Sequence, residues 1–274
     1  MAETIAGNDQ DVVLRADAVD LVRGDRALLD RVSFTVRAGE HWALLGANGA
    51  GKSTLLHLLA TYAHPTRGRI DILGRQLGHV DVFTLRPLVV LVTAHHPVRS
   101  GRTVRELVLT GATGTTDILA RWTPTTADGA RADAAIDVMG LGRLAAARWP
   151  ALSQGERART LIARALMGSP RVLLLDEPAA GLDVAGREQL LASLDAIRDG
   201  RPELTTVLVT HHLEELPAST SHALLLRDGR MLAAGTAGEV LTSELVSACF
   251  DYPVTITRHA GRWACTARGR AAAR

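Results

Sequence analysis

Apolar and polar residues follow one another along this chain in a pattern that predicts an α/β fold. Continuous apolar runs of strand length cover residues 42–45, 88–92 and 172–175, and residues 206–210 also have the pattern of a strand. Runs of this kind are typical of central parallel strands that are buried on both faces of a sheet. Looser alternation at residues 12–22 and 32–36 predicts strands that are buried on one face only.

Helical patterns connect these strands and change character in the middle of the chain. Residues 53–62, 157–167 and 186–197 look helical, as do residues 103–110 and 130–139. The stretch between the last two is rich in Thr, Gly and Ala, so we interpret the region from about 100 to 150 as a helical insertion. Residues 223–226 and 231–234 flank Asp228-Gly229, which predicts a hairpin.

Residues 46–53 form a phosphate-binding loop that reads Gly46-Ala47-Asn48-Gly49-Ala50-Gly51-Lys52-Ser53 and fits G-x-x-x-x-G-K-[ST] at every fixed position. The glycines let successive N–H groups point into one concavity, which suits phosphate oxygens. Lys52 can reach the β- and γ-phosphates, and the Ser53 hydroxyl is a candidate Mg²⁺ ligand. A predicted strand enters the loop and a predicted helix leaves it, so the phosphates would meet a helix N-terminus.

Composition strengthens this assignment. Of the 31 basic Lys and Arg residues, only Lys52 is a lysine. A chain that otherwise uses arginine keeps its one compact ammonium at the phosphate position, where the planar guanidinium would not fit. The same count excludes a GTPase switch, because guanine selection there needs an [N/T]-K-x-D motif and no second lysine exists.

Two acids, Asp176 and Glu177, directly follow the buried run at residues 172–175. In a P-loop protein the acid that ends this strand holds Mg²⁺. The adjacent glutamate is placed to polarise a water for attack on the γ-phosphate. We therefore predict Ser53 and Asp176 as metal ligands and Glu177 as the general base.

Residues 152–156 stand before a helical stretch and allow two interpretations. Ser153 and Glu156 have the S-x-x-E spacing of a capping box, so the segment can be a well-made helix start. The same segment leaves a helix N-terminus that is able to bind an anion.

Taken together, these motifs resemble the nucleotide-binding subunit of an ABC transporter over roughly residues 12–240. Residues 46–54, ending in Thr54, resemble the Walker A motif, and residues 172–177 resemble Walker B with its catalytic glutamate. His211 resembles the switch histidine. The other matches are the signature, Leu152-Ser153-Gln154-Gly155-Glu156, and the D-loop, Ala180-Gly181-Leu182-Asp183.

The resemblance implies an ABC-type P-loop NTPase with a mostly parallel central sheet, an antiparallel β-subdomain and a helical subdomain at about residues 100–168. It also implies a head-to-tail homodimer in which two ATP molecules lie between the Walker A of one copy and the signature of the other. His211 would contact the γ-phosphate. The helical subdomain would dock on a separate polytopic membrane subunit. We expect residues 241–274 to be a peripheral extension with a frayed, Arg-rich end.

The chain departs from the family pattern at several positions. Gln154 and Glu156 stand where the signature usually has Gly and Gln, and Ala47 replaces a common Pro. Arg23 occupies the place of the aromatic residue that stacks on adenine, and a guanidinium can also stack on a flat ring. Ala94 holds the place of the Q-loop glutamine, with His95 and His96 as possible stand-ins.

Bulk properties limit the partners. A net charge of +2 gives no general argument for nucleic acid. No run approaches the ~18 apolar residues of a membrane span, and the polar N-terminus does not resemble a signal peptide. We expect a cytoplasmic ATPase on the inner face of the membrane that uses ATP and Mg²⁺. The alternative is a soluble ABC-type mechanical ATPase that acts on ribosomes or nucleic acid, which usually carries two cassettes or long coiled coils.

Overall fold

A six-stranded sheet forms the centre of the computed structural model, which describes residues 11–93, 98, 101–115 and 121–268. Its strand order is β10-β9-β3-β8-β7-β6, and only β10 runs antiparallel to its neighbour. The predicted, mostly parallel core is confirmed. The strands are β3 (His41–Leu45), β6 (Val89–Thr93), β7 (Val172–Asp176), β8 (Thr205–Thr210), β9 (His222–Arg227) and β10 (Arg230–Thr236).

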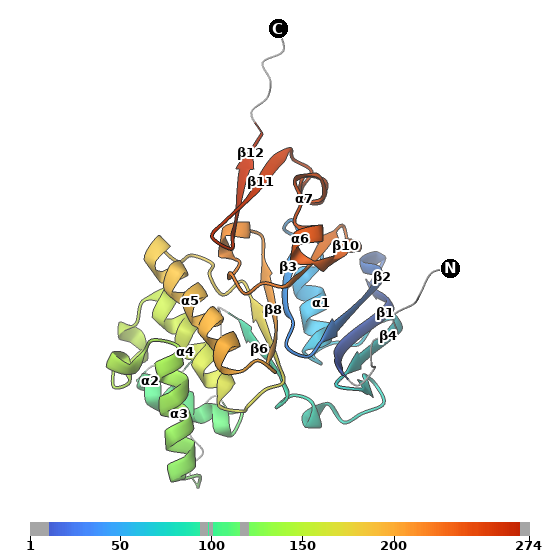
Figure 1. Cartoon of the computed structure of the whole chain (residues 1–274). Coiled ribbons are helices and arrows are strands. Elements are labelled where there is room, and N and C mark those ends of the chain that lie inside the picture. The colour runs from blue at the N-terminus through green and yellow to red at the C-terminus, as the bar shows by residue number, and fades with distance from the viewer. Residues whose placement is uncertain (1–10, 94–97, 99–100, 116–120, 269–274) are drawn as a thin grey trace.

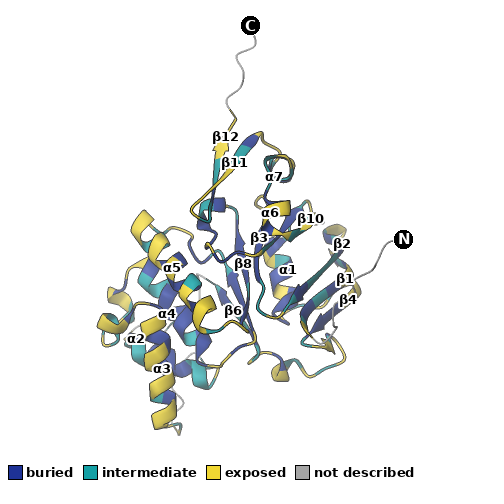
Figure 2. Ribbon diagram, viewed as in Figure 1, coloured by how far each residue is buried: buried dark blue, intermediate teal, exposed yellow. Residues whose placement is uncertain are grey.

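Strand β7 shows why a continuous apolar run marks the middle of such a sheet. Leu173 and Leu175 belong to the core on the side of the helices, and Val172 and Leu174 belong to the core on the side of the small sheet. Successive side chains of a strand point to opposite faces, so a strand covered on both faces needs apolar residues at every position. Figure 2 shows the central strands of this sheet, such as β3 and β8, as deeply buried.

A four-stranded antiparallel sheet lies on the other side of helix α1 (Lys52–Leu59) (Figure 1). Leucines of α1 are fully buried between the two sheets, where they join apolar residues of both. The predicted antiparallel β-subdomain is therefore confirmed. Its strands, in the order β2-β1-β4-β5, are β1 (Val12–Arg23), β2 (Arg26–Arg37), β4 (Arg67–Ile72) and β5 (Arg75–Gln76).

The helical insertion covers the opposite face of the central sheet, together with α5 (Val184–Gly200) (Figure 1). Its helices are α2 (Val104–Leu109), α3 (Thr126–Val138) and α4 (Gln154–Leu166), with short 3-10 turns η3 (Thr110–Ala112), η4 (Gly142–Leu144) and η5 (Trp149–Ala151). Helix α3 begins four residues earlier than its apolar pattern predicts, because Thr125 and Asp128 form a capping box. The outer faces of these helices are exposed (Figure 2).

The C-terminal segment is folded as far as it is described. It consists of α6 (Ala237–Val240), α7 (Ser243–Phe250) and a hairpin of β11 (Val254–His259) and β12 (Arg262–Ala267). Trp263 and Cys249 are buried in the main core, and burial raises the pKa of the Cys249 thiol to about 11. The prediction of a frayed end is wrong for residues 255–267, because strand pairing and the buried Trp263 hold them. Of the helices described, none combines the length and apolar character that crossing a bilayer requires.

Candidate functional site

A cavity of about 510 Å³ opens at the phosphate-binding loop. Residues from four separate parts of the chain surround it, which are the β1–β2 hairpin, the loop with the start of α1, the end of β7 and the β9–β10 turn. The lining residues are Arg26, Ala27, Leu28, Asn48, Gly49, Gly51, Lys52, Ser53, Thr54, Glu177, Asp228 and Gly229. Six of the residues predicted to bind the phosphates from residues 46–54 thus share one cavity with the predicted general base.

Two glycines explain why the loop needs this sequence. A Cβ atom at Gly46 would lie 2.3 Å from the carbonyl oxygen of Leu226 in β9, which no side chain tolerates. Gly51 has a φ of +102° and a Cβ there would lie 2.8 Å from the carbonyl oxygen of Leu28. Glycine alone combines the left-handed conformation with this close approach of neighbouring backbone. The loop is therefore shaped by packing against β2 and β9 as well as by its own sequence.

Lys52 is buried at the first position of α1. Its Nζ donates to the carbonyl oxygens of Gly46 at 2.7 Å and Ala47 at 3.0 Å. Burial lowers the pKa of the ammonium, and the carboxylates of Glu177 and Asp176 act in the opposite direction. The cation is thus held inside the loop, close enough to both acids for their charges to act on it.

Ser53 and Asp176 meet at the end of β7. The pKa of the Asp176 carboxyl is raised, first by burial and then by the neighbouring Glu177, and the Ser53 hydroxyl acts in the opposite direction. Asp176 Oδ1 is buried and has no hydrogen-bond partner among the described residues. A buried, unsatisfied carboxylate oxygen beside a hydroxyl is the donor set that Mg²⁺ prefers, with phosphate oxygens and water left to complete the shell. The residues present therefore fit the metal that the sequence predicts.

Glu177 and His211 are brought together by the pairing of β7 with β8. His211 Nδ1 lies 3.0 Å from Glu177 Oε1, and both side chains are about one-third exposed. Glu177 has a φ of +47°, an uncommon conformation for a residue with a side chain, and its N–H donates to Val209 at 3.0 Å. Strained backbone of this kind occurs where the surrounding structure fixes a functional side chain.

The signature segment lies at the start of α4, outside the lining of the phosphate cavity. Ser153 and Glu156 form the predicted capping box, in which Ser153 N donates to Glu156 Oε2 at 2.7 Å and Glu156 N donates to Ser153 Oγ at 3.3 Å. Leu152 is buried, whereas Gln154 is exposed. A Cβ atom at Gly155 would lie 3.3 Å from Cα of Gly186, so α4 and α5 begin side by side.

Asp183, predicted for the D-loop, caps α5 by accepting from the N–H of Gly186 at 2.7 Å. Because Gly186 faces Gly155, the structure joins the predicted D-loop and signature at one surface. Neither segment is among the residues that line the phosphate cavity.

Arg23, predicted to lie at the adenine, is not among the residues that line the cavity. Arg23 pairs with Arg26 across the β1–β2 turn, and Arg26, not Arg23, is among the lining residues. Asp228 and Gly229 also line it, because Gly229 N donates to Ala50 at 3.0 Å and Asp30 N donates to Gly229 at 2.9 Å. The sequence signalled Asp228-Gly229 as a turn, but no sequence pattern places that turn beside the loop. The Q-loop positions Ala94, His95 and His96 lie outside the described residues.

The fold and the cavity define a P-loop ATPase domain. The model of the ABC transporter family matches residues 29–180, and the chain belongs to this family.

Relatives and solved structures agree with this assignment. The chain is 36% identical over 248 residues to an uncharacterized ABC transporter ATP-binding protein, YlmA, of Bacillus subtilis (strain 168), covering 89% of this chain and 93% of that protein. It is 36% identical over 242 residues to the hemin import ATP-binding protein HmuV of Nocardia farcinica, covering 85% and 79%. Among solved structures, cbiO1 from Clostridium perfringens, part of the ABC transporter complex cbiONQ, superposes with a TM-score of 0.76 at 26% identity, covering 87% and 94%.

The chain is accordingly an ATP-binding subunit that hydrolyses ATP and powers a separate membrane-spanning transporter subunit. The alternative of a mechanical ATPase on ribosomes or nucleic acid is not favoured, because the family model and the named relatives are those of transporters.

Proposed function

We propose that two copies of this chain form a head-to-tail dimer that encloses two ATP molecules, each held by the phosphate loop of one copy and the signature of the other. The observation that carries the proposal is the convergence of Lys52, Ser53 and Glu177 on one cavity, while Ser153 and its helix start lie outside it. Within one chain a nucleotide in the cavity meets only half of the predicted contacts. A second copy, turned head to tail, would supply the exposed helix N-terminus, where the dipole favours an anion.

Each residue of the cavity has a role in this proposal. The N–H groups of residues 46–54 and the Lys52 ammonium bind the phosphates, while Ser53 and Asp176 hold Mg²⁺. When bound, Mg²⁺ would neutralise negative charge on the β- and γ-phosphates. Glu177 accepts the proton of the attacking water. His211, 3.0 Å from Glu177, orients that carboxylate and senses the γ-phosphate.

The exposed aromatic residues Tyr62 and Phe83 support a docking surface for the membrane subunit. They are 58% and 71% exposed, and the Arg86 guanidinium lies 5.4 Å from one ring centroid and 5.1 Å from the other. Exposed aromatic residues grouped around an arginine are typical of binding hot spots. We propose that this cluster and the helical insertion contact the membrane subunit at the cytoplasmic face of the membrane.

Glu177→Gln tests the dimer. Glutamine keeps the shape of glutamate but cannot accept a proton, so ATP binding should persist while hydrolysis slows by roughly 10²- to 10⁴-fold. ATP that binds only the dimer shifts the equilibrium toward it by mass action. We expect light scattering to show conversion of monomer to dimer with ATP, and no conversion with ADP or without nucleotide.

Ser153→Arg on the same background is the matched control. It places bulk and charge at the opposite phosphate site while leaving the phosphate cavity untouched, so it should block the dimer without removing ATP binding. A Glu177→Gln chain that stays monomeric at saturating ATP, alone and with its membrane subunit, would contradict the sandwich.

Identification of the membrane subunit decides the cargo. The name of one relative refers to hemin import, and that statement belongs to the relative. Copurification of the tagged chain from solubilised membranes should recover a polytopic protein, and Phe83→Ser should reduce the recovered amount. If the substitution leaves recovery unchanged, the aromatic cluster is not the docking surface.

A further inference from the structure

The C-terminal hairpin lies against the segment that follows the switch histidine. Strand β12 contacts η6 (Leu213–Glu215), the turn that begins two residues after His211. The hairpin is anchored in the main core by Trp263 and Val254, which are 7% and 8% exposed. In Figure 1 the hairpin stands above both α5 and the end of β8. A core-anchored element therefore contacts the turn that follows a predicted active-site residue.

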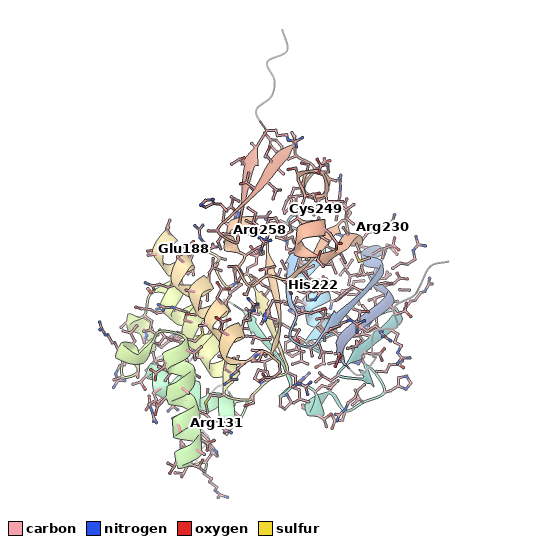
Figure 3. All side chains as sticks on the ribbon, in the orientation of Figure 1. Arg131, Glu188, His222, Arg230, Cys249 and Arg258 are labelled. Carbon is pink, nitrogen blue, oxygen red and sulfur yellow. The ribbon has the colours of Figure 1, made fainter. Side chains whose placement is uncertain are left out.

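Arg262 at the start of β12 connects three elements. Its Nη1 donates to Glu188 Oε2 at 2.8 Å, and its Nη2 donates to the carbonyl oxygen of Glu214 at 2.7 Å. Glu188 stands in the second turn of α5, the helix that Asp183 caps (Figure 3). The hydrogen bond from Arg262 is the main cause that lowers the pKa of the Glu188 carboxyl. The guanidinium of Arg262 thus joins the hairpin to α5 and to η6.

Glu214 is held a second time by the same strand. The backbone N–H of Cys265 donates to Glu214 Oε1 at 2.9 Å. The main chain and the side chain of Glu214 are therefore both bound to β12. These contacts add to the hydrogen bond that Thr210, at the end of β8, donates to Glu215 Oε2, so the turn is held by the hairpin as well as by the central sheet.

A cavity of about 360 Å³ makes these polar contacts important. Its lining residues are His211, His212, Leu213 and Glu214 on one side and Val246, Phe250, Val254 and Cys265 on the other. A segment next to a cavity lacks the close packing that holds side chains in a protein core. Leu213 and Leu216 anchor the inner side of the turn in the main core, and the polar contacts at Glu214 act on its other side. The anchors at Glu214 therefore contribute to the position of His211, which lies three residues earlier in the chain.

We propose that Arg262 is a positioning residue that sets the switch histidine, His211, relative to Glu177 by tying η6 and α5 to the C-terminal hairpin. The inference rests on the proposed role of His211 in ATP hydrolysis. Arg262 itself lies away from the phosphate cavity and acts only through the segment that it holds.

Steady-state ATP hydrolysis by the full chain tests the proposal, alone or with its copurified membrane subunit. Arg262→Ala should lower kcat by roughly fivefold to tenfold, because small displacements of a reacting group are costly. The KM for ATP should stay within about twofold, since the phosphate loop is untouched. Arg258→Ala is the matched control. It removes the same charge from the same hairpin, where Arg258 lies 4.9 Å from the Trp263 ring centroid, and should leave kcat unchanged.

Hydrogen exchange gives a readout that does not depend on catalysis. In Arg262→Ala the amides of residues 211–216 should exchange faster, while those of the phosphate loop and α1 keep their rates. Arg262→Lys keeps the positive charge but cannot reach both Glu188 and Glu214. Glu188→Gln removes the ion pair while Arg262 still donates to the carbonyl oxygen of Glu214. Both should give intermediate effects and fold normally.

The inference is overturned if Arg262→Ala matches Arg258→Ala in both kcat and exchange, or if it raises KM with kcat unchanged. Its failure is distinct from that of the proposed function, which Glu177→Gln tests separately. If His211→Ala keeps full kcat, the role proposed for His211 is wrong and so is this inference.

Discussion

His211 Nδ1 lies 3.0 Å from Glu177 Oε1, although 33 residues separate the two along the chain. Strands β7 and β8 are parallel neighbours, with Asp176 paired to Val209, so the residues just beyond each strand emerge at the same edge. Glu177 follows Asp176 directly, and His211 follows Thr210, the last residue of β8. The register of two strands thus creates a contact between a predicted base and a predicted sensor.

Lys52→Ala should reduce ATP hydrolysis by about 10²-fold or more, the loss expected when a preorganised cationic donor is removed. No other lysine exists to replace it. Nucleotide affinity should also fall, measured with a fluorescent ATP analogue beside a phosphate-release assay. Thermal unfolding monitored by circular dichroism serves as the control for folding. A variant that keeps most of its ATPase rate shows that the phosphate site is misassigned.

Asp176→Asn should make the nucleotide-free protein more stable while removing its activity. The change eliminates a buried charge whose Oδ1 has no partner among the described residues, so Tm should rise by on the order of a few degrees. Hydrolysis across a Mg²⁺ titration should fall by at least ~10²-fold, because a neutral amide is a weaker ligand.

Asp228→Asn is the control for this change, since Asp228 lines the same cavity with its side chain 88% exposed. Its Tm should equal that of the wild type. A lower Tm for Asp176→Asn, together with normal Mg²⁺ dependence, is the result that contradicts the metal assignment.

Arg26→Ala should raise the KM for ATP by about twofold to fivefold, the range expected when an exposed guanidinium no longer stacks on a ring. Arg26 lines the cavity, and Arg23, which the sequence indicated, does not. Arg23→Ala is therefore the comparison, and its KM should not change. A KM that rises in Arg23→Ala and not in Arg26→Ala would instead indicate Arg23 as the residue that contacts adenine.

His41 should make stability depend on pH. Its ring is 7% exposed, and Nδ1 lies 2.7 Å from Thr206 Oγ1. Burial, and next the Arg198 charge, lowers the pKa of this imidazole, against a weaker opposite effect of Asp195. The neutral ring therefore supports the fold above the unfolded pKa of about 6.5, and that support is lost as pH falls from there toward the lower folded pKa.

His41→Asn isolates this effect, because asparagine can still bond Thr206 but does not titrate. Thermal unfolding between about pH 7.5 and about pH 5 should show the Tm difference between wild type and variant narrowing as the solution becomes acidic. If the Tm difference stays constant across that range, the pKa of His41 is the same in the folded and the unfolded chain.

Much of the fold and half of the candidate site could be predicted from residues that are close in sequence. The phosphate loop is eight consecutive residues, and the capping box of Ser153 and Glu156 spans one helical turn, so local chemistry suffices for both. The run at residues 172–175 predicts a central strand because both faces of β7 are apolar. Such signals need no knowledge of distant neighbours.

Tertiary structure decided the rest. Arg26 and Asp228 reach the phosphate cavity only because the β9–β10 turn hydrogen-bonds Ala50 on one side and Asp30 on the other. Residues 255–267 form a hairpin whose Trp263 is buried in the core, a contact with distant segments that their own sequence does not predict. The residues predicted to bind phosphate could be named from consecutive positions alone. The residues that surround and hold that site could not be predicted, because they are brought there by packing between segments that are distant in sequence. A local sequence pattern contains no information about the energy of such packing.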